Sequence, residues 1–223
     1  MKRVRSNGRP LAVKVRTAKG RKISSTRWLQ RQLNDPYVHQ ARLKGYKSRA
    51  AFKLLQINEK FNIFKPGMTV IDLGCSPGGW SQVAKEKIKD GTILGVDKKK
   101  LDKINGVNFI IGDFLEANLR QKILNNFESD VDVILSDLAE KTTGNKSLDC
   151  IRTNQLCSEV LNFSRKVLSK NGVVVSKLFM GDDFEEVKLI ARKNFKKINF
   201  FKPKSSRDES RETYIHCAGL NTL

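Results

Sequence analysis

Short apolar runs alternate with longer segments of helical periodicity from residue 68 to the end of the chain. The runs predict strands of a buried sheet at 68–73, 92–97, 107–111, 131–136, 172–178, 197–201 and 213–218. The segments between them predict helices at 79–89, 115–126, 149–169 and 182–194. Helices between strands indicate crossover connections, so we expect an α/β fold with a mostly parallel sheet. The last two strands have no helix between them and are expected to pair antiparallel.

Two further helices are predicted before the first strand. The polar residues 24–26 can cap a short helix at 27–33, which an Asp-Pro pair ends. Trp28 in this helix is either a base-stacking platform or a core anchor, and we favour core packing. The second helix, 48–61, carries an apolar stripe with Lys53 at its margin. On the pattern alone, Lys53 is interpreted as a solvated side chain that extends past the core.

The predicted helix 149–169 is expected to stop at Asn171 and Gly172. Its inward face carries two of the four cysteines of the chain, and the sequence contains no Cys-x-x-Cys pair and no histidine at ligand spacing. We therefore expect reduced, buried thiols and no zinc or other metal site. The four cysteines are Cys75, Cys150, Cys157 and Cys217.

The chain of 223 residues is long enough for one domain with a sizeable core, and 39% of its residues are hydrophobic. No apolar run reaches the roughly 20 residues that span a bilayer. The N-terminus also lacks the apolar block of a secretory signal. We therefore expect a soluble, intracellular protein with no membrane partner.

A net charge of +20 argues against an enzyme of small neutral metabolites and favours a polyanionic partner such as nucleic acid. The alternative is a solvated basic surface without such a partner. Residues 1–34 hold eleven basic residues and no acidic one. We interpret residues 1–23 as a mobile basic extension that contacts RNA phosphates, followed by a folded domain at 24–223. A mitochondrial presequence is the alternative, and we favour a cytoplasmic location.

The first predicted strand contains Asp72 and leads into a glycine-rich turn. The spacing Asp-x-Gly-x-x-x-Gly-Gly differs from the Gly-x-Gly-x-x-Gly of dinucleotide-binding proteins. No Gly-Lys-Ser/Thr follows, which excludes a phosphate-binding P-loop. Glycines that admit a bulky ligand beside a carboxylate fit S-adenosylmethionine best, because this cofactor has a sulfonium cation, a ribose and an amino acid end but no phosphate.

Charged residues lie where the later strands end, and ligands of such sheets bind beyond the carboxyl ends of the strands. Asp97 can accept hydrogen bonds from both hydroxyls of a ribose, and Asp113 can accept one from an adenine amino group. Asp137 follows the fourth strand. Lys177 lies inside the apolar fifth strand, where a lysine needs a partner or a function.

The stretch from Asp72 to Gln82, Asp-Leu-Gly-Cys-Ser-Pro-Gly-Gly-Trp-Ser-Gln, resembles the hallmark of the FtsJ/RrmJ family of RNA ribose 2′-O-methyltransferases. The resemblance extends over about residues 24–220. It implies a Rossmann-like methyltransferase fold, with a seven-stranded, mostly parallel sheet and one antiparallel strand, and it implies S-adenosylmethionine as the cofactor. The cofactor-binding residues expected on this basis are Gly78, Trp80, Asp97, Asp113 and Asp137.

The family uses a Lys-Asp-Lys-Glu tetrad, and motifs for all four are present in the family's order. The matching residues are Lys53, Asp137, Lys177 and Glu212. We hypothesise that Lys177 accepts the proton of a ribose 2′-hydroxyl or activates it, and that Asp137 holds Lys177. Lys53 would favour the neutral form of Lys177 and bind substrate, and Glu212 would orient a lysine or the ribose. Alignment of the hydroxyl with the methyl donor should supply much of the rate.

Two departures from the family pattern are visible. Glu140 follows Ala139 at a position where the family usually has proline. A carboxylate near RNA phosphates would repel them, so we interpret Glu140 as a change in a substrate loop. His216, near which the family often has a hydrophobic residue, is interpreted as a filler of its strand and not as a catalytic base.

The resemblance implies methyl transfer from S-adenosylmethionine to the 2′-oxygen of a uridine in large-subunit rRNA, within the assembled subunit. Alternatives are tRNA or another RNA as the substrate, and a non-catalytic RNA-binding protein of ribosome assembly. The glycine spacing disfavours a nicotinamide-dependent oxidoreductase. We expect a monomer that binds the large ribosomal subunit or its rRNA, with no DNA partner.

Overall fold

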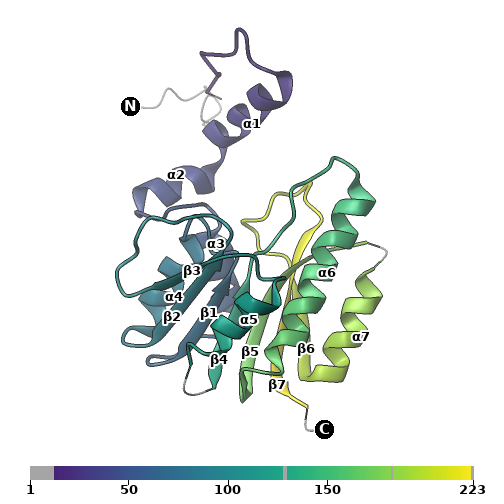
Figure 1. The fold of residues 1–223 in the computed structure, drawn as a ribbon. Helices are drawn as coiled ribbons and strands as arrows, with labels where there is room; N and C mark the ends of the chain where they lie inside the picture. The colour runs from purple at the N-terminus through teal and green to yellow at the C-terminus, as the bar shows by residue number, and fades with distance from the viewer. Residues whose placement is uncertain (1–12, 128–129, 182, 222–223) are drawn as a thin grey trace.

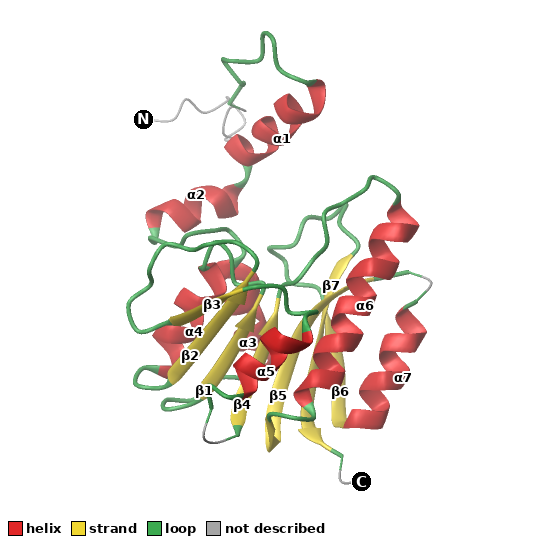
Figure 2. Ribbon diagram, in the orientation of Figure 1, coloured by secondary structure: helices red, strands yellow, loops and turns green. Residues whose placement is uncertain are grey.

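A seven-stranded sheet with helices on both faces forms the body of the protein (Figures 1 and 2). The computed structural model describes residues 13–127, 130–181 and 183–221. Two N-terminal helices project beyond the body on the side where the glycine-rich turn lies (Figure 1). The sequence prediction of an α/β fold is confirmed.

The strands follow one another in the sheet in the order β3-β2-β1-β4-β5-β7-β6, and β7 alone runs against its neighbours. All seven strands lie within a few residues of their predicted positions. Their bounds are β1 Thr69–Leu73, β2 Thr92–Asp97, β3 Asn108–Ile111, β4 Val131–Ser136, β5 Leu168–Phe179, β6 Phe195–Phe201 and β7 Glu212–Leu220. The predicted antiparallel pairing of the last two strands is confirmed, and β7 is inserted between β5 and β6.

The helices divide into three groups. One face of the sheet is covered by α3 (Ala51–Phe61) and α4 (Gly79–Ile88), and the other by α5 (Ala117–Leu124), α6 (Lys146–Ser164) and α7 (Phe184–Asn194). The projecting pair is α1 (Ile23–Asn34) and α2 (Pro36–Leu43). In the described part of the chain, every helix is too short or too polar to cross a bilayer.

The alternation of side chains along each strand separates two hydrophobic cores. Val70 of β1 and Val133 of β4 pack with α3 and α4, whereas their neighbours Ile71 and Ile134 pack with the helices of the opposite face. The same alternation places Tyr214 of β7 on the α3 side of the sheet. All four cysteines are buried, as expected.

The N-terminal helices differ from the prediction. α1 begins at Ile23 with Lys22 at its N-cap, so the serines at 24–25 lie within its first turn and give no side-chain cap. The Asp-Pro pair does end α1, but Asp35 then caps α2 by accepting hydrogen bonds from two backbone amides. Trp28 is 52% exposed and contributes nothing to a core, so our preference for core packing was wrong. The reason is that α1 buries none of its residues, so Trp28 does not pack into a hydrophobic core.

The boundaries of α6 were also wrong. The helix begins at Lys146 because Asn145 accepts hydrogen bonds from two backbone amides at its start. It ends at Ser164, and the chain then enters β5 at Leu168, which pairs with β4. Asn171 and Gly172 therefore lie inside a long strand and do not stop a helix.

His216 occupies the middle of β7. Its ring stacks on Phe61 of α3 at a centroid distance of 4.2 Å, and its Nδ1 lies 3.3 Å from the amide nitrogen of Asn199. Burial lowers the pKa of His216 to about 4. The ring of His216 is therefore packed and neutral, which agrees with our interpretation of this residue as a filler of its strand.

We expect the free energy of unfolding to fall as pH decreases from about 6.5 to 4, in part because His216 must then be protonated in the folded state. A folded-state pKa below the ordinary value means that the contribution is present at neutral pH and lost on acidification. The contribution is roughly 3 kcal/mol. Denaturant unfolding of His216→Gln across this range should show a shallower loss of stability than the wild type. The exposed His39 provides the control, because His39→Gln should retain the wild-type slope; equal slopes in all three proteins would contradict the expectation.

Candidate active site

Asp137 directly follows β4 and is surrounded by donors. Its backbone N–H donates to the carbonyl of Leu73, which fixes the chain at the end of the sheet. Lys177 Nζ lies 3.0 Å from Asp137 Oδ1 and donates to the Asp137 carbonyl at 2.8 Å. The Tyr214 hydroxyl donates to the same Oδ1 at 2.9 Å. The predicted pair of Lys177 and Asp137 is therefore formed, with a tyrosine as a third member.

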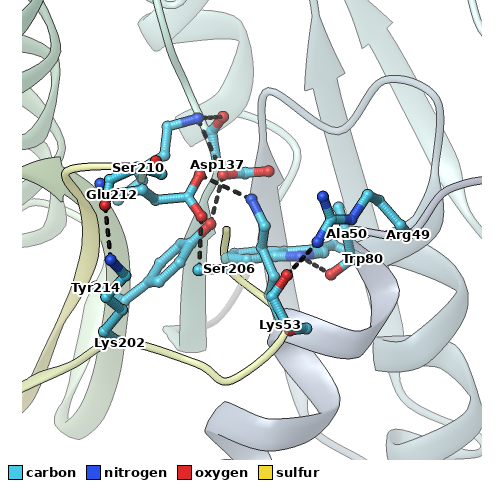
Figure 3. Close-up of polar contacts among 12 residues, drawn as sticks. Arg49, Ala50, Lys53, Trp80, Asp137, Lys202, Ser206, Ser210, Glu212 and Tyr214 are labelled. Carbon is cyan, nitrogen blue, oxygen red and sulfur yellow. Dashed lines mark hydrogen bonds and ion pairs between the residues drawn. The ribbon is translucent and has the colours of Figure 1, made fainter. Parts of the chain in front are cut away.

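Lys53 and Glu212 form a second pair beside the first (Figure 3). Lys53 Nζ lies 2.7 Å from Glu212 Oε2, and Ser206 Oγ donates to the other carboxylate oxygen at 2.8 Å. The ammonium of Lys53 also lies over the ring of Tyr214, 5.8 Å from its centroid. Only 13% of the Lys53 side chain is exposed, so the interpretation of a solvated lysine was wrong.

The sheet explains why these residues meet. In the antiparallel pairing of β5 with β7, Lys177 lies opposite Tyr214, and Phe179 lies opposite Glu212. Glu212 and Tyr214 are two residues apart and share a face. That face is covered by α3, which brings Lys53 to them. Residues from four distant parts of the sequence are thus held by one sheet and one helix.

The ionisation states in this cluster follow from burial and charge. Burial alone would raise the pKa of Asp137, but the charges of Lys177 and Lys53 hold it below its usual range. The hydrogen bond from Tyr214 acts in the same direction. Burial and the nearby carboxylates raise the pKa of Tyr214 well above its ordinary value, so its hydroxyl remains a donor.

A cavity of about 520 Å³ opens beyond the carboxyl ends of the parallel strands, within the size range of small-molecule sites. Asp97, Asp113 and Asp137 line it, from the ends of β2, β3 and β4. Asp97 accepts backbone hydrogen bonds on each oxygen, from Ser76 at 2.9 Å and from Lys99 at 2.8 Å. These bonds fix the carboxylate at the rim of the cavity.

Gly78 and Trp80 are not among the residues that line this cavity. Trp80 is buried, donates from its indole N–H to the carbonyl of Ala50 at 2.8 Å, and lies 5.5 Å from Tyr214 between ring centroids. Its side chain therefore supports the cluster around Lys53. Gly78 has a φ of +108°, and a side chain there would collide with Ile104.

Asp72 lies beneath the same loop and is fully buried. One carboxylate oxygen accepts a hydrogen bond from Ser81 Oγ at 2.6 Å, and the other has no partner among the described residues. Burial, opposed by the Ser81 hydrogen bond, raises the pKa of Asp72 to about 7. The ionised form of Asp72 is therefore disfavoured by its surroundings.

A second hollow, of about 280 Å³, adjoins the Lys53–Glu212 pair on its other side. Its basic lining comes from α1, α3 and the loop before β7, and Asp35 ties these segments together. Arg49 NH1 lies 2.7 Å and Arg207 NH2 3.7 Å from the Asp35 carboxylate. The residues around this hollow are Arg31, Arg49, Lys53, Arg207, Glu209, Ser210 and Glu212.

Sequence reasoning had not assigned three residues of this region. Tyr214 lies two positions after Glu212 in a predicted strand, and this spacing was the signal that both side chains share a face. Arg49 lay four positions before Lys53, which is one helical turn. Ser206 gave no signal, because its contact with Glu212 depends on how the loop before β7 folds back.

The sheet order, with its one reversed strand and a cavity at the strand ends, is that of a Rossmann-like methyltransferase fold, and a basic hollow lies at the Lys53–Glu212 pair. The chain belongs to the FtsJ-like methyltransferase family, whose sequence profile matches residues 46–220. The family predicted from the sequence is thus confirmed.

Relatives narrow the comparison further. Ribosomal RNA large subunit methyltransferase E of Rickettsia africae is 44% identical over 209 residues, which are 91% of this chain and 92% of that protein. The protein of the same name from Pelagibacter ubique is 46% identical over 193 residues, covering 86% of this chain and 95% of its own. A solved structure described as a ribosomal RNA methyltransferase, from Plasmodium falciparum, is 30% identical with a TM-score of 0.71, covering 78% of this chain and 98% of the other.

We expect Tyr214→Phe to lower the rate of methyl transfer roughly ten- to a hundredfold, because a hydrogen bond to a charged group is worth about 1.5–3 kcal/mol. The substitution removes one donor from Asp137 and leaves the aromatic packing against Trp80. Single-turnover methylation, with binding of S-adenosylhomocysteine measured separately, checks this. Tyr46, whose hydroxyl donates to Glu86 at 2.8 Å outside the cluster, provides the matched control Tyr46→Phe. A Tyr214→Phe rate equal to that of the control would show that the hydroxyl does not contribute.

Proposed function

We propose that the protein transfers the methyl group of S-adenosylmethionine to the 2′-oxygen of a ribose in large-subunit rRNA. One observation carries the proposal: three members of the tetrad line the two hollows, and the fourth, Lys177, contacts Asp137. Asp137 lines the cavity at the strand ends, and Lys53 and Glu212 line the basic hollow. Tyr214 joins the two pairs through its hydroxyl and its ring. A donor in one hollow and a ribose in the other would meet at Lys177.

The residues of the cavity fit S-adenosylmethionine. The cofactor is a cation with a ribose and an adenine, and the cavity offers carboxylates at successive strand ends. Asp97 would accept from the ribose hydroxyls and Asp113 from the adenine amino group. Gly78 and Trp80 would contribute through their backbone. When bound, the cofactor supplies an activated methyl group.

The side chains of the tetrad would hold the ribose and receive its proton. As the 2′-oxygen forms its bond to the methyl carbon, the bond from that carbon to the sulfonium sulfur would break and the neutral thioether would leave. The hydroxyl proton would pass to Lys177 Nζ, which must enter the reaction as a neutral amine. Asp137 fixes the position of Nζ through two contacts, one to its carboxylate and one to its carbonyl. Lys53, held by Glu212, would orient the ribose and oppose a second positive charge nearby. Positioning then supplies much of the acceleration.

The surface around the basic hollow suits an RNA strand. Arg49 and Arg207 are held by Asp35 at the edge of the hollow, and guanidinium groups bind phosphates in a fixed geometry. Trp28 and basic residues of α1 are exposed on the helix beside it, where a base could stack. Residues 13–22 are described as loop and hydrogen-bond to Gln30 and Asn34 of α1. The remainder of the proposed basic extension, residues 1–12, lies outside the described residues.

The finer parts of the proposal rest on the relatives and on the resemblance. The names of the relatives support large-subunit rRNA as the substrate. The FtsJ/RrmJ resemblance supports a uridine within the assembled subunit. That the enzyme is monomeric and cytoplasmic remains our expectation from the sequence pattern.

We expect tritium from the methyl group of S-adenosylmethionine to enter rRNA of large subunits purified from cells that lack this enzyme, and not bulk tRNA. Lys177→Met should reduce the rate at least a hundredfold, because it removes the proton acceptor and keeps the length of the side chain. S-Adenosylhomocysteine binding should remain. The exposed Lys170 of the same strand gives the control Lys170→Met, which should methylate at the wild-type rate.

The possible outcomes separate the alternatives. Label in tRNA alone would show that the substrate is tRNA and not large-subunit rRNA, while the proposed methyl transfer would still hold. Cofactor binding without label in any RNA would support a non-catalytic role in ribosome assembly. Wild-type rates in Lys177→Met would refute the assignment of the proton acceptor.

We also expect deletion of residues 1–12, which removes Lys2, Arg3, Arg5 and Arg9, to flatten the dependence of RNA affinity on salt. Each phosphate contact contributes about 0.7 to the log-log slope for single-stranded RNA. Binding to an rRNA fragment at several salt concentrations measures the slope, and S-adenosylhomocysteine affinity should not change. An unchanged slope would mean that this segment makes no phosphate contacts.

A further inference from the structure

The loop between β4 and α6, residues 138–145, lies along the cavity and is attached to the fold at both ends. At its start, Leu138 packs so closely over Gly74 that a side chain at Gly74 would lie 3.0 Å from the Leu138 backbone nitrogen. At its end, Thr143 donates to Asp149 from both its backbone N–H and its hydroxyl, at 2.7 and 2.8 Å. The stretch from Leu138 to Lys141 lines the cavity between these attachments.

Glu140, within this stretch, lines the cavity and contacts a lysine from another segment of the chain. Its Oε1 lies 3.5 Å from Nζ of Lys98, which follows β2. The same Nζ lies 2.9 Å from Oδ2 of Asp113, beyond the end of β3. Lys98 thus bridges two carboxylates that belong to different segments, and all three residues line the cavity. These contacts place the Glu140 carboxylate beside Lys98, and its effect on an RNA substrate stays a prediction.

The two contacts of Lys98 are unequal. The shorter one joins it to Asp113, whose other oxygen accepts the backbone N–H of Leu115 at 3.0 Å. The pKa of Lys98 is raised, first by its hydrogen bond to Asp113 and further by the charges of Asp113 and Glu140. Lys98 therefore contacts the Asp113 oxygen that does not accept from the backbone of Leu115.

We propose that Lys98 and Glu140 form a latch that positions the loop 138–145 over the adenosine end of the cofactor. The proposal rests on the S-adenosylmethionine site proposed above. When the adenine amino group donates to Asp113 Oδ2, Lys98 moves toward Glu140 and shortens the 3.5 Å contact. This movement draws the loop against the cavity. Because the loop is held there by the attraction between Lys98 and the carboxylate of Glu140, a ligand with an adenine amino group is released more slowly. Lys98 and Glu140 act as positioning residues and not as catalytic ones.

The latch can be tested with S-adenosylhomocysteine and with S-inosylhomocysteine, which has an oxygen in place of the adenine amino group. Affinity is measured by calorimetry and the dissociation rate by stopped-flow fluorescence. Glu140→Gln and Lys98→Met should each raise the dissociation rate of S-adenosylhomocysteine about three- to tenfold. The double variant should be no faster than either single variant, because the two residues act as one unit. Binding of S-inosylhomocysteine should be weaker and should respond to neither substitution.

Lys100→Met is the matched control, since Lys100 is an exposed lysine of the same segment that does not line the cavity. It should retain the wild-type dissociation rate for both ligands. Dissociation rates of Glu140→Gln and Lys98→Met equal to this control would overturn the latch, as would equal effects on the two ligands. Failure of the wild type to bind S-adenosylhomocysteine would instead refute the proposed function.

Discussion

The contact of Lys177 with Asp137 is the interaction on which the site depends. Both groups are largely buried, and an unpaired charge in such a place would be strongly destabilising. The contact requires that the end of β4 lie beside β5, and the hydroxyl of Tyr214 requires that β7 lie beside β5 in antiparallel register. The insertion of β7 between β5 and β6 is therefore part of the active site as well as of the fold.

The alternation of side chains on β5 and β7 extends the same constraint to the second pair. Once Lys177 and Tyr214 face α3, Glu212 faces it too, and Lys53 is the charged residue of α3 that meets it. Tyr214 connects the two pairs. Its hydroxyl donates to Asp137, the partner of Lys177, and the ammonium of Lys53 lies over its ring. A single sheet register therefore determines the geometry of the entire tetrad.

The sequence was sufficient for elements with strong local signals. The strands were predicted because apolar runs of this length, bounded by turns, have few other interpretations, and the glycine-rich turn identified the family. Long-range contacts were not predictable from periodicity. Lys53 could be placed only through Glu212, which lies 159 positions away. Trp28 is exposed because, among the described residues, α1 buries none of its side chains. The Asp-Pro pair was correctly predicted to end α1, yet the same two residues also begin α2.

The two hollows differ in the charge of their lining residues, although the protein as a whole has a net charge of +20. The cavity at the strand ends is lined by four carboxylates and three lysines, whereas the basic hollow is lined by four cationic side chains and two carboxylates. Under the proposed function, the carboxylates would attract the cationic methyl donor and the basic hollow would attract the polyanionic RNA, so each ligand would be disfavoured in the place of the other. Asp137 lines the first hollow and Lys53 the second, and Tyr214 contacts both residues. The position of Glu140 follows from the same separation, because a carboxylate that would repel RNA is compatible with the cofactor side, where Lys98 holds it.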